Sequence, residues 1–308
     1  MSKVSDLTLA IIGAINKSRL VRKNESDYRF TGSQLPVCPR KVLLNKSKWM
    51  PRIDTPKFDS SLQNGTMNHS IVQKWLASNK LLLGKFIVDG KMYPSPQFGE
   101  NKNDVDSYDM ESVCGPVYNK DGSLATYQEF RVYDKKSGFS GLIDGVIKLD
   151  DWSKWSVCDF KFVGQWSYDK FIKDGLTESN PYYYQLNSYR YLLERKPPTI
   201  KGKPIELSNN MYLIVFKEDF IRNLNNSVNI ISVKYDEEAF KKQRKIYLKT
   251  LEAIRNRDRK FFLSDDSRLC RTEKDCGFCT AKGLCFGQNY KKELSKELSE
   301  MWGLFSDK

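Results

Sequence analysis

The segment WSVCDFKFVGQW places a carboxylate and an ammonium one residue apart in an otherwise apolar stretch. Side chains alternate in a β-strand, so Asp159 and Lys161 are expected to point to one face, and Cys158 and Phe160 to the other. Taken alone, the pair is explained by an exposed ion pair on a half-solvated strand. It indicates a reactive site only if further polar groups converge on it.

Two carboxylates lie in strand-like segments upstream of this pair. Asp144 stands in SGLIDGVIKLD and Glu129 in YQEFRVYD, and the linker KKSG between these segments predicts a hairpin that could bring the two carboxylates together. A carboxylate in such an apolar strand is costly unless it is paired or binds a metal ion. The pattern therefore predicts a metal site on neighbouring strands.

Oxygen ligands beside a lysine predict phosphoryl chemistry. Asp144 and Asp159, helped by Glu129, could hold Mg²⁺ or Mn²⁺ and leave water sites open. The ion could activate a water molecule and neutralise charge on a phosphoryl group. Lys161 could position that water or stabilise the developing charge, with a pKa that we expect burial to lower.

The surrounding elements predict an α/β fold with a mixed central sheet flanked by helices. Helices are expected at residues 5–20, at 66–79, after the start signal Asn180–Pro181, and from Asp236 to about residue 260. Further strands are expected in KWSVCDFKFV, NMYLIVFKED and NIISVKYD, and a loop or surface insertion at 84–125. We expect one compact unit made of an N-terminal region (1–125), a core (126–235) and a C-terminal region (236–308).

The chain is basic, which suggests a polyanionic partner. Its 51 Lys and Arg exceed its 38 Asp and Glu, giving a net charge of +13. Basic and aromatic residues mix in 17–52, as in proteins that bind single-stranded nucleic acid, although a solvated lysine-rich surface is the alternative. The candidate DNA-contacting residues there are Arg19, Arg22, Lys23, Arg40 and Lys41.

The cysteines bear on the compartment and on a second metal centre. Seven cysteines, an odd number, and the lack of a membrane-length apolar run predict an intracellular, cytoplasmic protein without membrane contact. Four of them cluster in CRTEKDCGFCTAKGLC, a spacing that suits either Zn²⁺ or an iron–sulfur cluster. These are Cys270, Cys276, Cys279 and Cys285.

Asp144 followed by the Asp159-Phe160-Lys161 triplet resembles the PD-(D/E)XK nuclease superfamily. The downstream pair Gln185 and Tyr189, as Q-x-x-x-Y, is similar to the extra motif of its RecB-like branch, and the pair shares one helical face. The sole histidine, His69 in GTMNHSIVQKWL, is a core residue by its apolar setting alone. The resemblance implies instead a helix opened by Gly65-x-x-x-His69, with His69 as a metal ligand and Gln185 and Tyr189 in support of the site.

Cys38, in LPVCPRKVLL, extends the resemblance to iron–sulfur members of this branch, the CRISPR-associated RecB-like exonucleases and AddB-type nuclease domains. That likeness implies a [4Fe–4S] cluster held by Cys38, Cys276, Cys279 and Cys285, clamping the two ends of the chain together. A local Zn²⁺ site that uses Cys270 is the alternative.

Together these features predict a metal-dependent DNA nuclease. We expect an exonuclease that acts on single-stranded DNA or DNA ends in recombination, repair or phage DNA metabolism. The alternatives are a flap or single-strand endonuclease and a catalytically dead DNA-binding subunit. The partners that remain open are a second copy of the chain and a helicase or recombination protein.

Overall fold

The computed structural model divides the chain into two compact units. The larger unit comprises Arg29–Pro36 and Gly65–Leu248, and the smaller unit comprises Met1–Tyr28, Val37–Asn64 and Lys249–Lys308. The structure describes residues 30–31, 35–46, 56–94, 110–134, 139–149, 151–222, 226–269, 285–286 and 289–304. The expected helix at 5–20 and the residues Arg19, Arg22, Lys23, Cys270, Cys276 and Cys279 lie outside these ranges.

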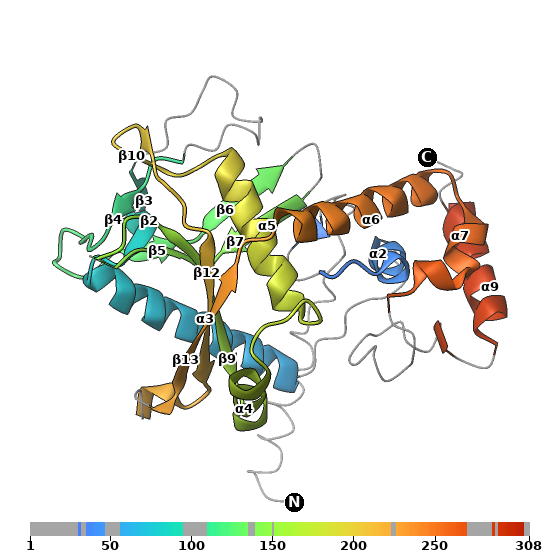
Figure 1. Cartoon of the computed structure of the whole chain (residues 1–308), viewed down its shortest axis with the longest axis horizontal. Helices are drawn as coiled ribbons and strands as arrows, with labels where there is room; N and C mark the ends of the chain where they lie inside the picture. The colour runs from blue at the N-terminus through green and yellow to red at the C-terminus, as the bar shows by residue number, and fades with distance from the viewer. Residues whose placement is uncertain are drawn as a thin grey trace, which may run out of the picture. The chain divides into compact units, whose positions relative to one another are not determined.

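An eight-stranded mixed sheet forms the centre of the larger unit (Figure 1). Its main path runs through β13 (Val228–Lys234), β12 (Asn210–Lys217), β9 (Ser156–Val163), β8 (Gly145–Ile147), β2 (Leu82–Val88) and β3 (Lys91–Tyr93). The short strands β4 (Val113–Cys114) and β5 (Thr126–Gln128) also pair with β2. Strands β9 and β12 are parallel and the other pairs are antiparallel, which confirms the predicted α/β class with a mixed sheet.

A second, three-stranded sheet has the order β1 (Phe30–Thr31), β7 (Phe139–Ile143), β6 (Phe130–Asp134). Strands β6 and β7 pair in antiparallel fashion, which confirms the predicted hairpin. Only Asp144 separates β7 from β8, so the chain passes from this sheet to the central one at that residue. A two-stranded sheet of β10 (Thr199–Ile200) and β11 (Lys203–Pro204) completes the unit.

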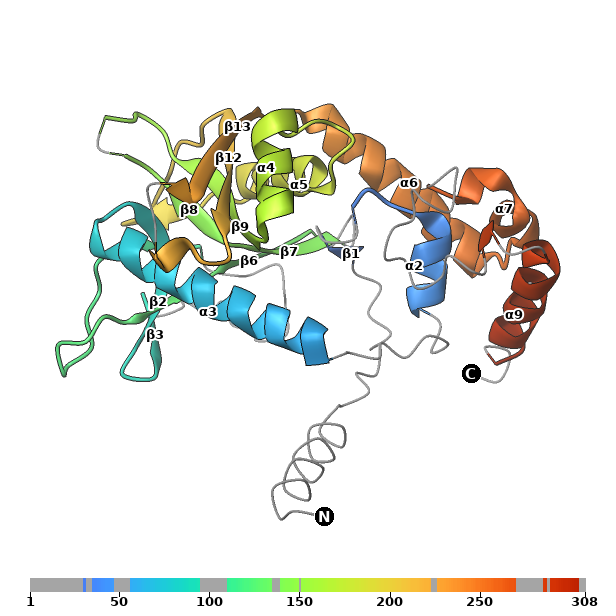
Figure 2. The ribbon, with the colours of Figure 1, turned by 90° about the horizontal axis from the view of Figure 1, so that it is seen from below.

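Two helices pack on opposite faces of β9 (Figure 2). Helix α3 (Pro56–Ser78) contributes Val72 and Ala77 to the core cluster that also holds Cys158 and Phe160. Helix α5 (Pro181–Arg195) lies on the other face, where Asp159 points. Asn180 accepts a hydrogen bond from the Tyr182 N–H and so caps α5 as predicted. The alternation predicted for the DFK strand is therefore confirmed.

Several element bounds differ from the expectations. Helix α3 begins at Pro56, so Gly65 lies inside it and does not open it. The stretch 84–125 includes most of β2 together with β3 and β4, and is not a loop throughout. The expected boundary at residue 125 falls inside the larger unit, because β2 pairs with β5 and β8.

Helix α6 (Glu237–Arg255) is capped by Asp236, as predicted, but it ends before residue 260. Arg257 has a positive φ of 52°, which breaks the helix, and Asp258 caps the next one, α7 (Arg259–Leu263). No helix among the described residues is long and apolar enough to cross a membrane.

A hydrophobic cluster holds the smaller unit together. It joins α2 (Pro39–Lys46) to α7 and α9 (Tyr290–Leu304) through Leu43, Phe262, Leu294 and Leu298, among others. Arg40 lies beside this cluster with 0% exposure, and its guanidinium donates to the carbonyls of Phe262 and Ser264 and to the Ser267 hydroxyl. A buried guanidinium with these partners is not presented to a phosphate. We therefore correct the expected role of Arg40 from DNA contact to structural tie, while Lys41 is exposed.

Candidate active site

Asp159 and Lys161 form a buried ion pair on β9. The Lys161 Nζ lies 2.5 Å from Asp159 Oδ2, and Asp159 is only 1% exposed. Asp159 Oδ1 accepts a hydrogen bond from the Gln185 side chain of α5 at 3.1 Å. Asp159 and Lys161 are thus not a solvated surface pair, because Asp159 is buried and α5 contacts it through Gln185.

Asp144 reaches the same place from the junction between β7 and β8. Its Oδ2 accepts a hydrogen bond from the Phe160 N–H at 2.7 Å, which fixes the carboxylate beside β9. Residue Gly145 pairs with Cys158 across β8 and β9, so the register places Asp144 next to the DFK segment. Glu129 directly precedes Phe130, which pairs with Ile143, and it therefore stands beside Asp144 as the hairpin predicted.

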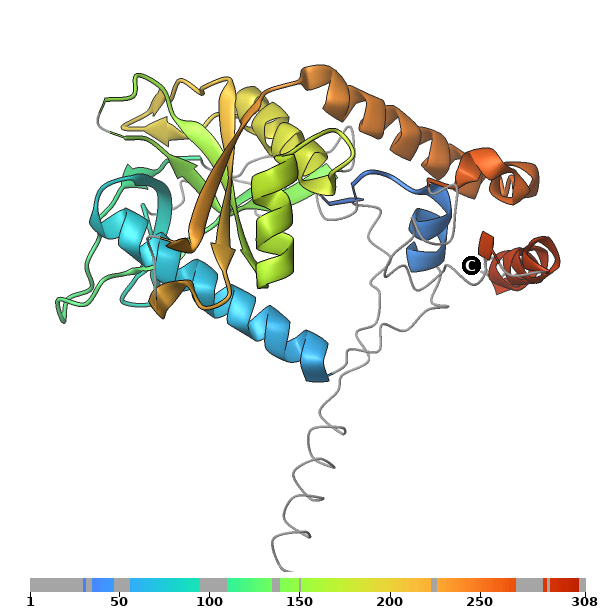
Figure 3. The same cartoon turned by 60° about the horizontal axis from the view of Figure 1, so that its bottom comes forward.

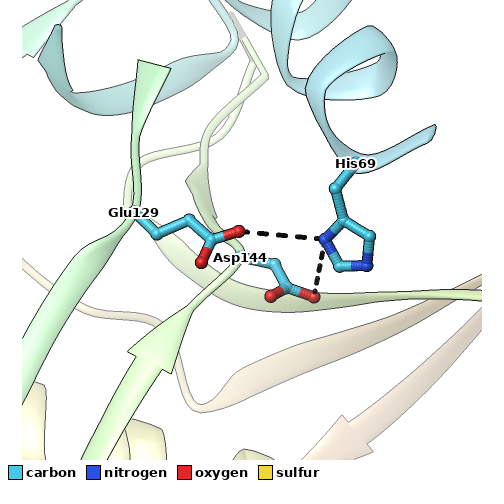
Figure 4. A group of neighbouring side chains, drawn as sticks. All are labelled: His69, Glu129 and Asp144. Atoms are coloured by element: carbon cyan, nitrogen blue, oxygen red, sulfur yellow. Dashed lines mark ion pairs between the residues drawn. The ribbon is translucent and has the colours of Figure 1, made fainter. Parts of the chain in front are cut away.

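His69 completes a group of three potential ligands (Figure 4). Its Nδ1 lies 3.6 Å from Asp144 Oδ2 and 3.9 Å from Glu129 Oε1, which is too long for hydrogen bonds. One ligand atom from each residue lies within 4.8 Å of the others. Mg²⁺ and similar ions bind oxygen at about 2.1 Å, so two ligands of one ion lie at most about 4.2 Å apart, and the two separations from His69 Nδ1 are within this limit. The donor set therefore fits a divalent cation.

The Gln185–Tyr189 pair of α5 contacts the site through Asp159. Gln185 donates to Asp159 Oδ1 and also lies 2.9 Å from the Tyr189 hydroxyl. The Tyr189 ring packs so closely on Gly141 of β7 that an added Cβ would approach it to 2.5 Å. The absence of a side chain at Gly141 thus lets α5 approach the sheet closely enough for Gln185 to hold Asp159.

Gln73 is a site residue that sequence reasoning missed. It is 4% exposed, and its amide donates to Glu129 Oε1 at 3.1 Å and to the Asp144 carbonyl at 3.0 Å. It lies one helical turn after His69 on α3, and this i, i+4 spacing was the available signal. Gln73 thus links two of the three potential ligands to the helix that carries the third.

Burial shapes the protonation of the three potential ligands. Burial and the neighbouring Asp159 carboxylate raise the pKa of Asp144 well above its usual range and also raise that of Glu129. Burial and the Lys161 ammonium lower the pKa of His69 to about 4. His69 is consequently neutral at physiological pH, which is the form that binds metal ions.

The pKa of Lys161 differs from the expectation. Burial lowers this pKa, but the Asp159 and Asp144 carboxylates outweigh burial and raise it above the ordinary lysine value. The expected lowering is therefore wrong, because sequence cannot weigh burial against two nearby charges. The two carboxylates therefore favour the protonated form of Lys161, which acts as a hydrogen-bond donor.

Two of the cysteines expected in a second metal centre lie among the described residues. Cys38 is half-buried and Cys285 is buried, and both belong to the smaller unit. Their expected partners Cys276 and Cys279, and the alternative ligand Cys270, lie outside the described residues. The cluster and its Zn²⁺ alternative stay predictions.

Comparisons with known proteins add a distant likeness of fold. No family model matches the chain, and curated proteins gave no significant match. An alkaline exonuclease from Laribacter hongkongensis, LHK-Exo, aligns with 43% of this chain and 61% of its own length, at 16% identity and a TM-score of 0.30. The structure of LHK-Exo in complex with dAMP aligns with 77% of this chain and 95% of its own, at 10% identity and a TM-score of 0.40. At such TM-scores the function has to be inferred from the site residues alone.

Proposed function

We propose that this chain is a metal-dependent deoxyribonuclease of the PD-(D/E)XK type. One observation carries the proposal: His69, Glu129 and Asp144 bring their ligand atoms within 4.8 Å of one another. The buried Asp159–Lys161 pair lies beside this group, since Asp144 is hydrogen-bonded to the residue between them. An ion site next to a fixed ammonium suits phosphodiester hydrolysis.

The site residues divide into metal ligands and a phosphate-binding lysine. His69, Glu129 and Asp144 would hold Mg²⁺ or Mn²⁺, and Asp159 would complete the set. The bound ion would lower the pKa of a water molecule and neutralise charge on the phosphoryl group. Lys161, kept protonated by its carboxylate neighbours, would donate hydrogen bonds to the attacked phosphate and stabilise its growing charge.

Gln185 and Tyr189 would keep Asp159 in place. Gln185 donates to one oxygen of Asp159 while Lys161 pairs with the other, so both carboxylate oxygens have fixed partners. A carboxylate held in this way is already ordered in the folded protein, so substrate binding does not have to restrict its motion. We therefore assign these two residues a positioning part, without contact with the reacting atoms.

The finer assignments rest on the sequence. We propose an exonuclease of the RecB-like branch that acts on single-stranded DNA or DNA ends, in a cytoplasmic setting. A [4Fe–4S] cluster on Cys38, Cys276, Cys279 and Cys285 would be structural, with Zn²⁺ on Cys270 as the alternative. A homo-oligomer and a helicase or recombination partner are compatible with this proposal.

Digestion of labelled single-stranded DNA with Mn²⁺ tests the proposal. We expect the wild-type chain to degrade a linear strand and spare a circular one, and Lys161→Met to lose at least about a thousand-fold in rate. Cleavage of the circle would identify an endonuclease. DNA binding without cleavage in any divalent ion would identify a dead binding subunit, and full activity of purified Lys161→Met would overturn the assignment of this site.

A further inference from the structure

Aromatic rings lead from Lys161 towards the surface of the larger unit. The Lys161 Nζ lies 4.9 Å from the centre of the Tyr182 ring, on the first turn of α5. Tyr182 in turn contacts Phe171, with ring centres 6.0 Å apart and planes inclined by 31°. Phe171 belongs to α4 (Gln165–Asp174), the helix that follows β9 directly and lies beside α5 (Figure 3).

The first turn of α4 presents a large exposed ring. Trp166 is 76% exposed, and the Lys170 Nζ lies 5.6 Å from its ring centre, one helical turn further on. Single exposed apolar residues are common on protein surfaces and need no function. Trp166 differs in its place, since it follows the catalytic strand β9 with Gly164 and Gln165 alone between them.

The charges of α4 do not favour a phosphate-binding helix. Lys170 and Lys173 are matched by Asp169 and Asp174, and the Gln165 amide donates to Asp169. A balanced helix gives little electrostatic attraction for a backbone that carries one charge per nucleotide. Its exposed indole instead suits the flat faces of unpaired bases, which stack on aromatic rings whatever their sequence.

We propose that unpaired bases next to the attacked phosphate stack on Tyr182 and Trp166. This inference rests on the proposed nuclease function and deepens it, because paired bases inside a duplex do not offer their faces to a protein ring. A strand whose phosphate reaches Lys161 has the Tyr182 ring beside it, and Trp166 follows Lys161 by five residues, on the first turn of the helix that Phe171 joins to Tyr182. The rings thus select single-stranded DNA, while Lys161 contacts its backbone.

Binding of short strands to the full chain in EDTA tests this, because hydrolysis is then excluded. The probes are a fluorescent oligo-dT and an abasic strand with the same phosphates, and the readout is anisotropy. We expect Trp166→Ala to weaken oligo-dT binding about ten-fold, Trp166→Phe to restore most of it, and the salt dependence to keep its slope. The matched control is Ile172→Ala, which removes an aliphatic side chain of 57% exposure from the same helix and should bind as wild type.

The abasic strand separates stacking from a general loss of binding. If Trp166 contacts bases, wild type and Trp166→Ala should bind the abasic strand equally. Wild-type affinity of Trp166→Ala for oligo-dT, or an equal loss on both strands, would overturn the inference while the nuclease function stands. A wild-type chain that neither binds nor cleaves DNA would contradict the proposed function and this inference with it.

Discussion

The two units of this chain bury charge in opposite ways. In the larger unit, Asp144, Glu129 and Asp159 bring carboxylates of like sign together, so that burial and repulsion raise the pKa of the first two. Among the described residues of the smaller unit, Arg40 is a buried cation that donates to neutral carbonyls and a hydroxyl. The clustered carboxylates lower the stability of the fold, and a bound cation would reduce their repulsion. The hydrogen bonds of Arg40 instead connect segments of the smaller unit and stabilise it.

The largest effect is expected from neutralising the central carboxylate of the larger unit. Asp144→Asn keeps the shape and an oxygen for the Phe160 N–H, but it removes a charge from the ion site. We expect cleavage to fall at least about a thousand-fold while the metal-free protein gains at least about 1 kcal/mol of stability at pH 8, because the raised pKa reports a destabilised carboxylate. Urea unfolding in EDTA and a cleavage assay measure both. A variant that loses both activity and stability would show that Asp144 is a structural residue.

In the smaller unit we expect the opposite result, a loss of stability with the cleavage rate retained. Arg40→Met should destabilise the fold by about 2–4 kcal/mol, because the Phe262 and Ser264 carbonyls and the Ser267 hydroxyl lose a buried donor. Cleavage per folded molecule should stay near the wild-type rate, and Lys41→Met, at an exposed neighbour, is the matched control. A selective loss of DNA affinity in Arg40→Met, with stability unchanged, would restore its assignment to DNA.

The buried amide of Gln73 should affect the ion more than the fold. Gln73→Leu removes the donor that holds Glu129 and the Asp144 carbonyl. Residues that orient metal ligands typically contribute 10- to 100-fold to affinity, so we expect Mn²⁺ binding to weaken by about that factor. Gln73→Met, which keeps a similar length without a donor or an added charge, should behave similarly. Unchanged Mn²⁺ affinity in both variants would assign Gln73 to packing alone.

The net pH dependence of stability is expected to be small, because the contribution of His69 and those of the carboxylates oppose each other. The pKa of His69 is lowered from 6.5 to about 4, so between these values the unfolded chain binds a proton that the folded chain does not. His69 therefore favours folding fully above pH 6.5, and this contribution is lost as the pH falls towards 4, by at most about 3 kcal/mol. The raised pKa values of Asp144 and Glu129 act in the opposite direction, since protonation relieves them as the pH falls.

Comparison with His69→Gln isolates the contribution of the histidine. The wild-type chain in EDTA should lose more stability between pH 6.5 and 4.5 than the variant does. Parallel stability curves for the two proteins over this range would show that the His69 pKa is not lowered in the folded state.

Sequence predicted the parts of the site that local signals specify. Alternation in the DFK strand, the linker of the β6–β7 hairpin and the capping residues Asn180 and Asp236 each act over a few residues, and the structure confirms them. The sequence Thr55–Pro56 at the start of α3 has the same pattern of a capping residue before proline, but the expectation followed the apolar spacing of 66–79 and placed that helix too late in the chain.

The missed features depend on contacts between distant segments. Gln73 matters because the hairpin brings Glu129 to it, and its spacing from His69 indicates only that the two residues share a helical face. The raised pKa of Lys161 depends on its distances to two carboxylates, and the burial of Arg40 depends on α7, more than two hundred residues later. Composition counts Arg40 as positive charge but does not tell which positive charges face solvent.

Calorimetric titration of the metal-free chain with Mn²⁺ tests the central claim most directly. We expect the His69, Glu129 and Asp144 group of wild type to bind Mn²⁺, and His69→Ala to lose most of that affinity while it remains folded by circular dichroism. The Ile172→Ala variant, changed on the surface of α4, should bind as wild type does. If folded wild type binds no Mn²⁺ at this site, or if folded His69→Ala binds it with wild-type affinity, then the three residues are not the metal centre.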